Sequence, residues 1–305
     1  MTSIEWTQET FNPWWGCTAV SPGCAHCYAE AFALRGVGIE GGPVAWGRGM
    51  DRRRNPSDYW KAPLDWNARA GRSGVRLKVF CASMCDVFDS EVDLSWRVDL
   101  WDLVRRCQNL DWQILTKRPE NIQAMLPQDW GEGWENVWLG TSVEDQIRAD
   151  ARIPVLSGIP AAVRFLSVEP LLGPVVLDLR NISWVICGGE SGRSARPLDP
   201  AWALSVRDQC VENKVPFFFK QWGGRDKKAA GKILEGRTWR QFPKSPFRKN
   251  RRRKLIAAAV GRYAGKNERL PVDRAVSTEL EKRARLEGIS RREYLDRLLR
   301  KALNL

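Results

Sequence analysis

The chain has 305 residues, of which 43% are hydrophobic, so it can bury a sizeable core as one large domain or two unequal ones. No apolar run approaches the roughly 20 residues that span a bilayer, which excludes a membrane-spanning protein and leads us to expect a cytoplasmic one. The formal net charge of +13 favours an anionic partner, and the single histidine, His26, excludes a metal site built from two histidines of one chain.

Three cysteines near the N-terminus, Cys17, Cys24 and Cys27, have the spacing Cys-x6-Cys-x2-Cys. Three thiolates from one short loop can hold a [4Fe–4S] cluster by three of its irons, whereas a structural cluster normally takes four cysteines. The fourth iron then stays open, as it does in catalytic metal centres. Pro22 and Gly23 allow the tight turns that bring the three sulfurs together.

Two other uses of these cysteines remain open. A disulfide needs an oxidising compartment, but the N-terminus has no basic-then-apolar signal segment, and eight cysteines in 305 residues is not disulfide-rich. A closed zinc site would need a further ligand, such as Cys81 or Cys85. Such sites usually contain two Cys-x2-Cys pairs, and this chain has one.

Short apolar runs alternate with amphipathic stretches in the next part of the chain. The runs are Leu77–Cys81, Trp112–Leu115, Val137–Leu139, Val163–Leu166, Trp184–Cys187 and Val215–Phe219. Helical patterns such as Leu94–Cys107 and Pro200–Asn213 lie between them. With a further strand near Ile4–Thr7, these elements predict an α/β fold with a partial or full parallel β/α barrel. A doubly wound open sheet is the alternative.

Charged or hydroxyl residues follow all six apolar runs. The candidates are Ser83, Asp86, Lys117, Arg118, Ser142, Glu144, Ser167, Glu169, Glu190, Lys220, Gln221 and Trp222, the last an aromatic. Any one of the polar residues can be a helix cap. Because strand ends of a barrel meet at one rim, the whole set favours a ligand site there.

Nearly all of the excess positive charge lies at the C-terminal end. Residues 242–305 hold 19 Lys and Arg against 7 Asp and Glu, whereas residues 1–241 hold 30 against 29. A near-neutral body with a basic tail suggests a body that does chemistry and a tail that binds nucleic acid. The expected nucleic-acid contacts are Arg248, Lys249, Arg251, Arg252, Arg253, Lys254 and Arg269. The alternative is a solvated tail that aids solubility.

The sequence therefore divides into a barrel over residues 1–241, a basic linker over 242–266 and a small domain over 267–305. In the last, Arg269–Val276 can be a strand, and two helices follow, the first ending near Gly288. Ser290 and Glu293 form a capping box for the second. This order resembles the ribbon-helix-helix DNA-binding fold, which forms only as a dimer. The alternative is a helical hairpin packed against the barrel.

Several motifs together resemble a known family. They are Thr10–Cys17, Ser21–Cys24, Cys27–Glu30, Leu115–Pro119, Leu166–Gly173 and Gly188–Gly192. These segments are similar to those of phage-encoded three-cysteine-motif proteins, over roughly residues 1–241. That family is similar in turn to radical S-adenosylmethionine enzymes. In the usual radical-enzyme pattern three residues, not six, separate the first two cysteines.

The resemblance implies that Cys17, Cys24 and Cys27 hold a [4Fe–4S] cluster whose open iron binds S-adenosylmethionine. Reductive cleavage of that cofactor would yield a 5′-deoxyadenosyl radical. His26 would take the ring position before the third cysteine. Ser83, Asp86, Ser142, Glu144, Ser167 and Glu169 would bind the cofactor. Lys117, Arg118, Lys220 and Gln221 would meet an anionic substrate or the cofactor carboxylate. Glu190 would contact the substrate, and Trp222 would stack on a base.

Two functions follow from these observations. The first is a radical S-adenosylmethionine enzyme acting on a nucleic acid or a nucleotide-derived substrate, with a separate electron-donor protein and with a homodimer or a partner subunit completing it. The second is a non-catalytic DNA-binding protein with a structural zinc or iron–sulfur site. The sequence does not identify the catalytic residues.

Overall fold

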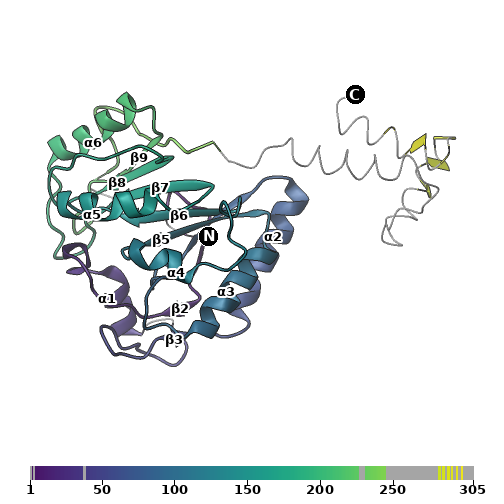
Figure 1. Cartoon of the computed structure of the whole chain (residues 1–305), viewed down its shortest axis with the longest axis horizontal. Helices are drawn as coiled ribbons and strands as arrows, with labels where there is room; N and C mark the ends of the chain where they lie inside the picture. The colour runs from purple at the N-terminus through teal and green to yellow at the C-terminus, as the bar shows by residue number, and fades with distance from the viewer. Residues whose placement is uncertain are drawn as a thin grey trace. The chain divides into compact units, whose positions relative to one another are not determined.

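The computed structural model describes residues 2, 4–36, 39–226 and 231–244, together with isolated residues between 281 and 297 (Figure 1). The chain divides into two compact units, Met1–Pro246 and Phe247–Leu305. No helix in the described ranges is both long and apolar enough to cross a membrane.

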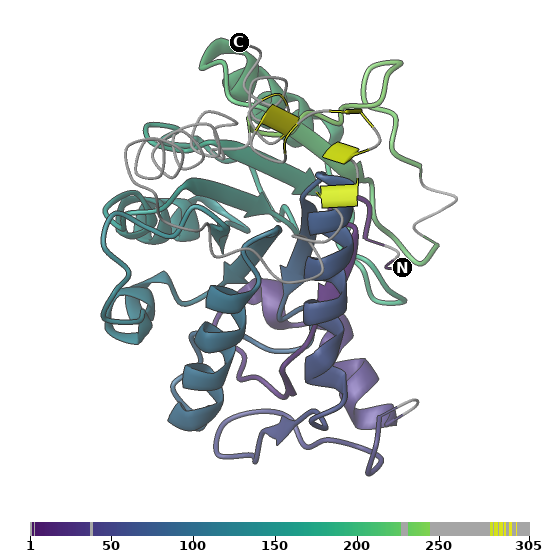
Figure 2. The same cartoon turned by 90° about the vertical axis from the view of Figure 1, so that its right-hand side faces the viewer.

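The first unit is built on one curled sheet of seven parallel strands (Figure 2). The strands are β1 (Glu9–Phe11), β4 (Leu77–Cys81), β5 (Leu110–Thr116), β6 (Val137–Ser142), β7 (Val163–Val168), β8 (Trp184–Gly188) and β9 (Phe217–Gln221). They pair in chain order, and within the described residues β1 does not pair with β9. The partial barrel is thus confirmed. A full barrel and a doubly wound sheet are wrong, since the sheet stays open and its strand order never reverses.

Helices follow the strands at nearly every crossover. They are α1 (Tyr28–Arg35), α2 (Ala62–Ser73), α3 (Leu94–Arg106), α4 (Ile122–Met125), α5 (Gln146–Ser157) and α6 (Pro200–Glu212). Asp93, Asp145 and Asp199 cap α3, α5 and α6, each accepting a hydrogen bond from a main-chain N–H of the first turn. The helices that were predicted over Leu94–Cys107 and Pro200–Asn213 are therefore present, each one residue shorter.

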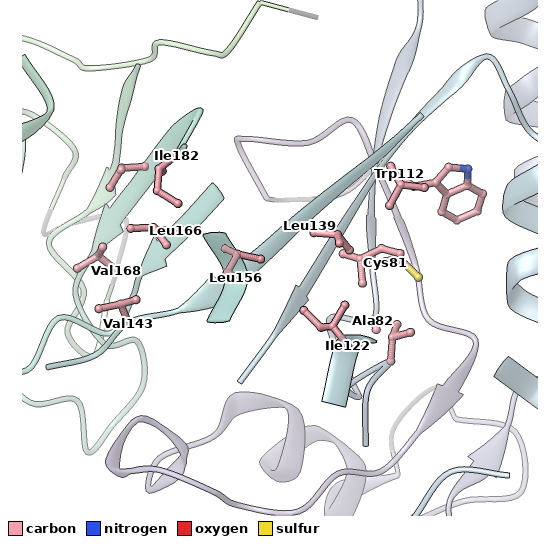
Figure 3. Packing of buried hydrophobic residues seen from close by; sticks show 14 of the residues in the cluster. Cys81, Ala82, Trp112, Ile122, Leu139, Val143, Leu156, Leu166, Val168 and Ile182 are labelled. Carbon is pink, nitrogen blue, oxygen red and sulfur yellow. The ribbon is translucent and has the colours of Figure 1, made fainter. Parts of the chain in front are cut away.

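The convex face of the sheet packs against α2 to α6. Figure 3 shows part of this apolar cluster, in which Leu156 of α5 lies between Leu166 and Leu139 of the sheet. Trp112 of the sheet and Ile122 of α4 belong to the same cluster. All five side chains are fully buried. Right-handed crossovers between strands in chain order put α2 to α6 on this same side, whereas Ala33 of α1 belongs to a separate small cluster.

The concave face carries a second cluster, rich in aromatic rings. It comprises Trp6, Phe80, Trp138, Val163, Phe165, Trp184, Ile186 and Phe218. Because side chains alternate between the two faces of a strand, these residues mark which positions point inward. Gly140 lets the Phe165 ring lie against its strand, since a Cβ there would be 2.4 Å from the ring.

Two features near the N-terminus differ from the sequence-based expectation. The predicted strand Ile4–Thr7 is not one, and the first strand begins at Glu9 instead. Trp6 lies in the concave cluster, which explains the apolar character of that stretch. In addition, β2 (Trp14–Trp15) and β3 (Arg53–Arg54) form a small antiparallel ribbon that was not expected.

The second unit is described only at isolated positions. The main-chain N–H of Glu293 donates to the Ser290 hydroxyl, and the main-chain N–H of Ser290 donates to the Glu293 carboxylate. The predicted capping box is thereby confirmed. Gly288 has a φ of +67°, as a helix end favours. The predicted strand Arg269–Val276 and the seven nucleic-acid contacts lie outside the described residues.

Candidate metal and cofactor site

The segment over residues 16–27, here called the cysteine loop, lies against the carboxyl ends of the strands. Its Ser21 hydroxyl donates to Oε1 of Glu144, 2.6 Å away and just after β6. Nδ1 of His26 lies 3.0 Å from Oε2 of Glu190, just after β8. The loop and the polar strand ends that the sequence singled out therefore share one rim.

Glu144, just after β6, holds the cysteine loop against the sheet. Its side chain is fully buried and accepts a hydrogen bond of 2.8 Å from Nη1 of Arg152 as well as the one from Ser21. Gly23 packs directly on it, since a Cβ at Gly23 would be 2.5 Å from the Glu144 Cγ. The glycine beside the second cysteine is thus required by close approach rather than by an unusual backbone angle.

Cys17 faces a buried cation. Nη1 of Arg118 lies 3.5 Å from its Sγ, and the same guanidinium pairs with Asp86 at 2.9 Å. Burial raises the pKa of the Cys17 thiol to about 12, Asp86 adds to this, and Arg118 opposes it. Arg118 also donates to the Thr18 carbonyl at 2.6 Å, so a third strand end, that of β5, holds the cysteine loop.

Cys27 and Cys24 have their own polar surroundings. Cys27 immediately precedes α1, and burial raises its pKa while the main-chain N–H groups of Glu30 and Ala29 and the Lys117 ammonium lower it. Helix N-termini favour thiolates in this way. The Sγ of Cys24 lies 3.8 Å from the Ser21 hydroxyl. All three cysteines are free and partly exposed.

The charges around the three thiols suit an anionic centre. Arg118, the N-terminus of α1 and Lys117 lie beside them. A zinc ion draws its thiolates to about 2.3 Å, and among the described residues no three side chains of His, Cys, Asp or Glu are grouped to hold a metal ion. A four-iron cluster would bind each thiolate through a different iron.

The two cysteines that could close the site differ in position. Cys81 is fully buried in the convex apolar cluster, on a strand of the sheet. Cys85 lies nearer the loop, because its backbone forms an isolated parallel bridge with Gly16. Burial raises the pKa of Cys85 well above its ordinary value, and Cys17 contributes to that rise. Of the two, Cys85 is thus the one whose backbone contacts the cysteine loop.

On the concave face, polar side chains follow the aromatic cluster towards the carboxyl ends of the strands. Ser142 follows Trp138 and Gly140 on β6, and it pairs in register with Ser167 of β7. The Ser142 hydroxyl accepts a hydrogen bond of 3.2 Å from Nζ of Lys117. The concave face thus changes from apolar to polar at the edge where the cysteine loop lies.

Ser167, Glu169 and Lys220 complete this polar edge. Glu169 and Lys220 form an ion pair whose side chains are 18% and 22% exposed. Ser167 is 3% exposed, and its side chain lies on the concave face like that of Phe165, two residues earlier on β7.

Glu190 joins the cysteine loop to the loop after β8. Burial opposes its ionisation, but hydrogen bonds from Arg196 and His26 lower its pKa to about 2. Arg196 holds both carboxylate oxygens, at 2.6 and 2.9 Å, and donates to the Pro22 carbonyl at 3.0 Å. Glu190 therefore anchors the loop and is not open to an anionic substrate.

Other candidate residues are also engaged within the protein. Asp86 accepts hydrogen bonds from Thr116 and from three further donors, and Ser83 donates to Asn12. Gln221 donates to the Ser191 hydroxyl. The Trp222 indole donates to the Ile233 carbonyl at 2.9 Å, and its ring packs on Phe219 of the convex cluster. These side chains position loops.

The sequence reasoning missed three residues that hold the site together: Ser21, Arg152 and Arg196. Ser21 belongs to the motif Ser21–Cys24, but its partner lies 123 residues away. Arg152 is in the middle of a helix, where an arginine usually faces solvent. Only Arg196 had a local signal, since it ends the glycine-rich stretch that follows β8.

Comparison with known proteins gives a family match. The model of the family described as "Protein of unknown function (DUF5131)" matches residues 1–243. The match spans the half-barrel with its cysteine loop. No curated protein and no solved structure matches the chain.

Proposed function

The chain belongs to the family described as "Protein of unknown function (DUF5131)", and from its site we propose a radical S-adenosylmethionine enzyme that acts on a nucleic acid or a nucleotide-derived substrate. The observation that carries the proposal is the cysteine loop. It brings three free, partly exposed thiols to the carboxyl edge of a parallel half-barrel, where such folds build their active sites.

The residues present suit a [4Fe–4S] cluster held by Cys17, Cys24 and Cys27. When bound, the cluster would supply an electron to S-adenosylmethionine, whose reductive cleavage yields a 5′-deoxyadenosyl radical. The loop's own task is to hold the three thiols still, which it does through Glu144, Glu190 and their hydrogen bonds.

The cofactor would lie on the polar concave edge. Ser167 is the strongest candidate for a contact, because its side chain lies on the concave face of β7 where that face becomes polar. Ser142 lies opposite it in register, and the partly exposed Glu169 and Lys220 pair lies next to it. Ser83, Asp86 and Glu144 instead serve to hold the cysteine loop and its surroundings.

The substrate assignment rests on charge. The C-terminal segment is strongly basic, and two further arginines lie at the carboxyl edge itself. Arg193 and Arg225 are exposed, follow β8 and β9, and form no ion pair within the described ranges. Their loops lie side by side, because Gly192 N–H donates to the Gly224 carbonyl at 3.1 Å. Unpaired guanidinium groups at a site rim favour a phosphate-bearing substrate.

The proposal also requires an electron-donor protein, and it is compatible with a homodimer or with a partner subunit.

One observation favours the second function, a non-catalytic DNA-binding protein with a structural metal centre. The backbone of Cys85 forms a bridge with Gly16, the residue before Cys17, which makes Cys85 the candidate for a fourth thiolate. A cluster with four thiolates has no open iron.

Anaerobic purification of the full chain separates these functions. We expect a brown protein with about four irons per chain that converts S-adenosylmethionine to 5′-deoxyadenosine under reductant. The Cys24→Ser variant should lose the iron, and the matched Cys85→Ser variant should keep both iron and cleavage. A colourless, zinc-loaded protein, or loss of iron in both variants, would favour the structural centre.

A further inference from the structure

Arg118 lies in an unexpected place for a residue proposed to meet an anion. Its side chain is 7% exposed, and its guanidinium has three acceptors within the protein. These are Asp86 at 2.9 Å, the Thr18 carbonyl at 2.6 Å and the sulfur of Cys17 at 3.5 Å. A substrate cannot reach it without displacing the cysteine loop.

The surroundings of Arg118 hold its guanidinium still. Asp86 is itself fixed by the Thr116 hydroxyl at 2.7 Å and by the main-chain N–H groups of Phe88 and Lys117, at 2.9 and 3.2 Å. A second acidic group, Asp89, lies 4.0 Å from Nη2 of Arg118. Because carboxylates neutralise most of its charge, the N–H bond that points at Cys17 acts as a fixed, local donor.

We propose that Arg118 is a positioning residue whose N–H···S hydrogen bond to Cys17 raises the reduction potential of the cluster that the proposed function requires. Reduction adds negative charge to the cluster and its thiolates. A buried donor aimed at one thiolate stabilises that added charge, and hydrogen bonds to sulfur are an established determinant of cluster potentials. The inference rests on the proposed function, since it concerns the same centre.

The other two cysteines have different neighbours and no guanidinium donor among the described residues. The hydroxyl of Ser21, 3.8 Å from Cys24, is directed to Glu144 at 2.6 Å. Cys27 meets main-chain N–H groups and the charge of Lys117 rather than a guanidinium. The three cysteines would therefore be inequivalent, and Cys17 would be the one that receives a guanidinium hydrogen bond.

The test compares Arg118→Lys with Arg52→Lys in the anaerobically purified full chain. Arg52 is a buried member of the same ionic network, bound to Asp89 at 2.8 Å and to the Thr18 hydroxyl at 2.7 Å, and none of its hydrogen bonds reaches a sulfur. Midpoint potentials are read from a redox titration followed by electron paramagnetic resonance. Arg118→Lys should shift the potential to more negative values, and Arg52→Lys should match the wild type.

A measurement on the wild type keeps the test decisive if Arg118→Lys fails to fold. The protein is labelled with nitrogen-15 in its arginine side chains and reduced. Pulsed electron paramagnetic resonance should then detect coupling between the cluster spin and a guanidinium nitrogen. Absence of that coupling, or equal potentials for the two variants and the wild type, would overturn the inference and leave the proposed function intact. A protein without iron would instead contradict the proposed function itself.

Discussion

Glu190 shows at the scale of one residue how the cysteine loop is tied to the sheet. Its carboxylate accepts hydrogen bonds from Arg196 and contacts His26, and its pKa falls from 4.5 to about 2. A carboxyl group with a lowered pKa in the folded state stabilises the fold above its ordinary pKa. That contribution fades as the pH falls from 4.5 towards 2.

The Glu190→Gln variant should therefore be less stable than the wild type at neutral pH and closer to it in acid. Urea unfolding at several pH values measures the difference in free energy of unfolding. We expect the full difference near pH 7 and a smaller one near pH 3. A difference that stays constant with pH would contradict the assigned role of the carboxylate.

Gly23 gives a second residue-scale prediction. A methyl group there would lie 2.5 Å from the Glu144 Cγ, and Arg152 keeps that side chain from moving. Overpacking of this kind typically costs about 1–3 kcal/mol, so Gly23→Ala should lower the iron content and the melting temperature. Gly173→Ala is the matched control, because a Cβ at Gly173 meets nothing within 4 Å. Equal iron content in the two variants would contradict the close fit of loop and sheet.

At the scale of elements, the apolar runs identified the strands because buried parallel strands need continuous hydrophobic residues. The polar strand ends were likewise readable. The ribbon of β2 and β3 was not, since two-residue strands leave no periodicity. Nor could the sequence separate side chains that face the concave edge from those that hold loops. Asp86 and Ser167 both lie at or just after the end of an apolar run. Only the fold shows that the carboxylate of Asp86 accepts a hydrogen bond from Arg118.

The packing of helices on the convex face yields an element-scale prediction. Leu139 of β6 is fully buried in the convex cluster, whereas Leu94 at the start of α3 is 69% exposed. Leu139→Ala should lower the free energy of unfolding by about 2–5 kcal/mol, and Leu94→Ala should change it by less than about 0.5 kcal/mol. Urea midpoints of the two variants measure this. Similar losses would contradict the assigned core.

For the whole molecule, the sequence could not decide whether the barrel closes, because apolar runs do not reveal which strands become edges. It did indicate where the basic segment begins. Phe242 nevertheless belongs with the half-barrel, since its ring lies 5.2 Å from Trp184 and 5.5 Å from Phe218. A truncation that tests the basic segment should therefore end after Lys244 and keep these contacts.

Removal of residues 245–305 should weaken binding to single-stranded and duplex oligonucleotides and flatten its dependence on salt. The plot of log affinity against log salt has a negative slope, and each lost phosphate contact reduces the magnitude of that slope by about 0.7–0.9. Fluorescence anisotropy over a range of salt concentrations measures both quantities. Unchanged affinity and slope would mean that the basic segment serves another purpose.

The measurement that most directly tests the central claim is the electron paramagnetic resonance spectrum of the reduced, iron-loaded full chain with and without S-adenosylmethionine. Three thiolates leave one iron free, so added cofactor should change the spectrum of both the wild type and the Cys85→Ser variant. Spectra that are identical with and without the cofactor would show a closed centre and contradict the account.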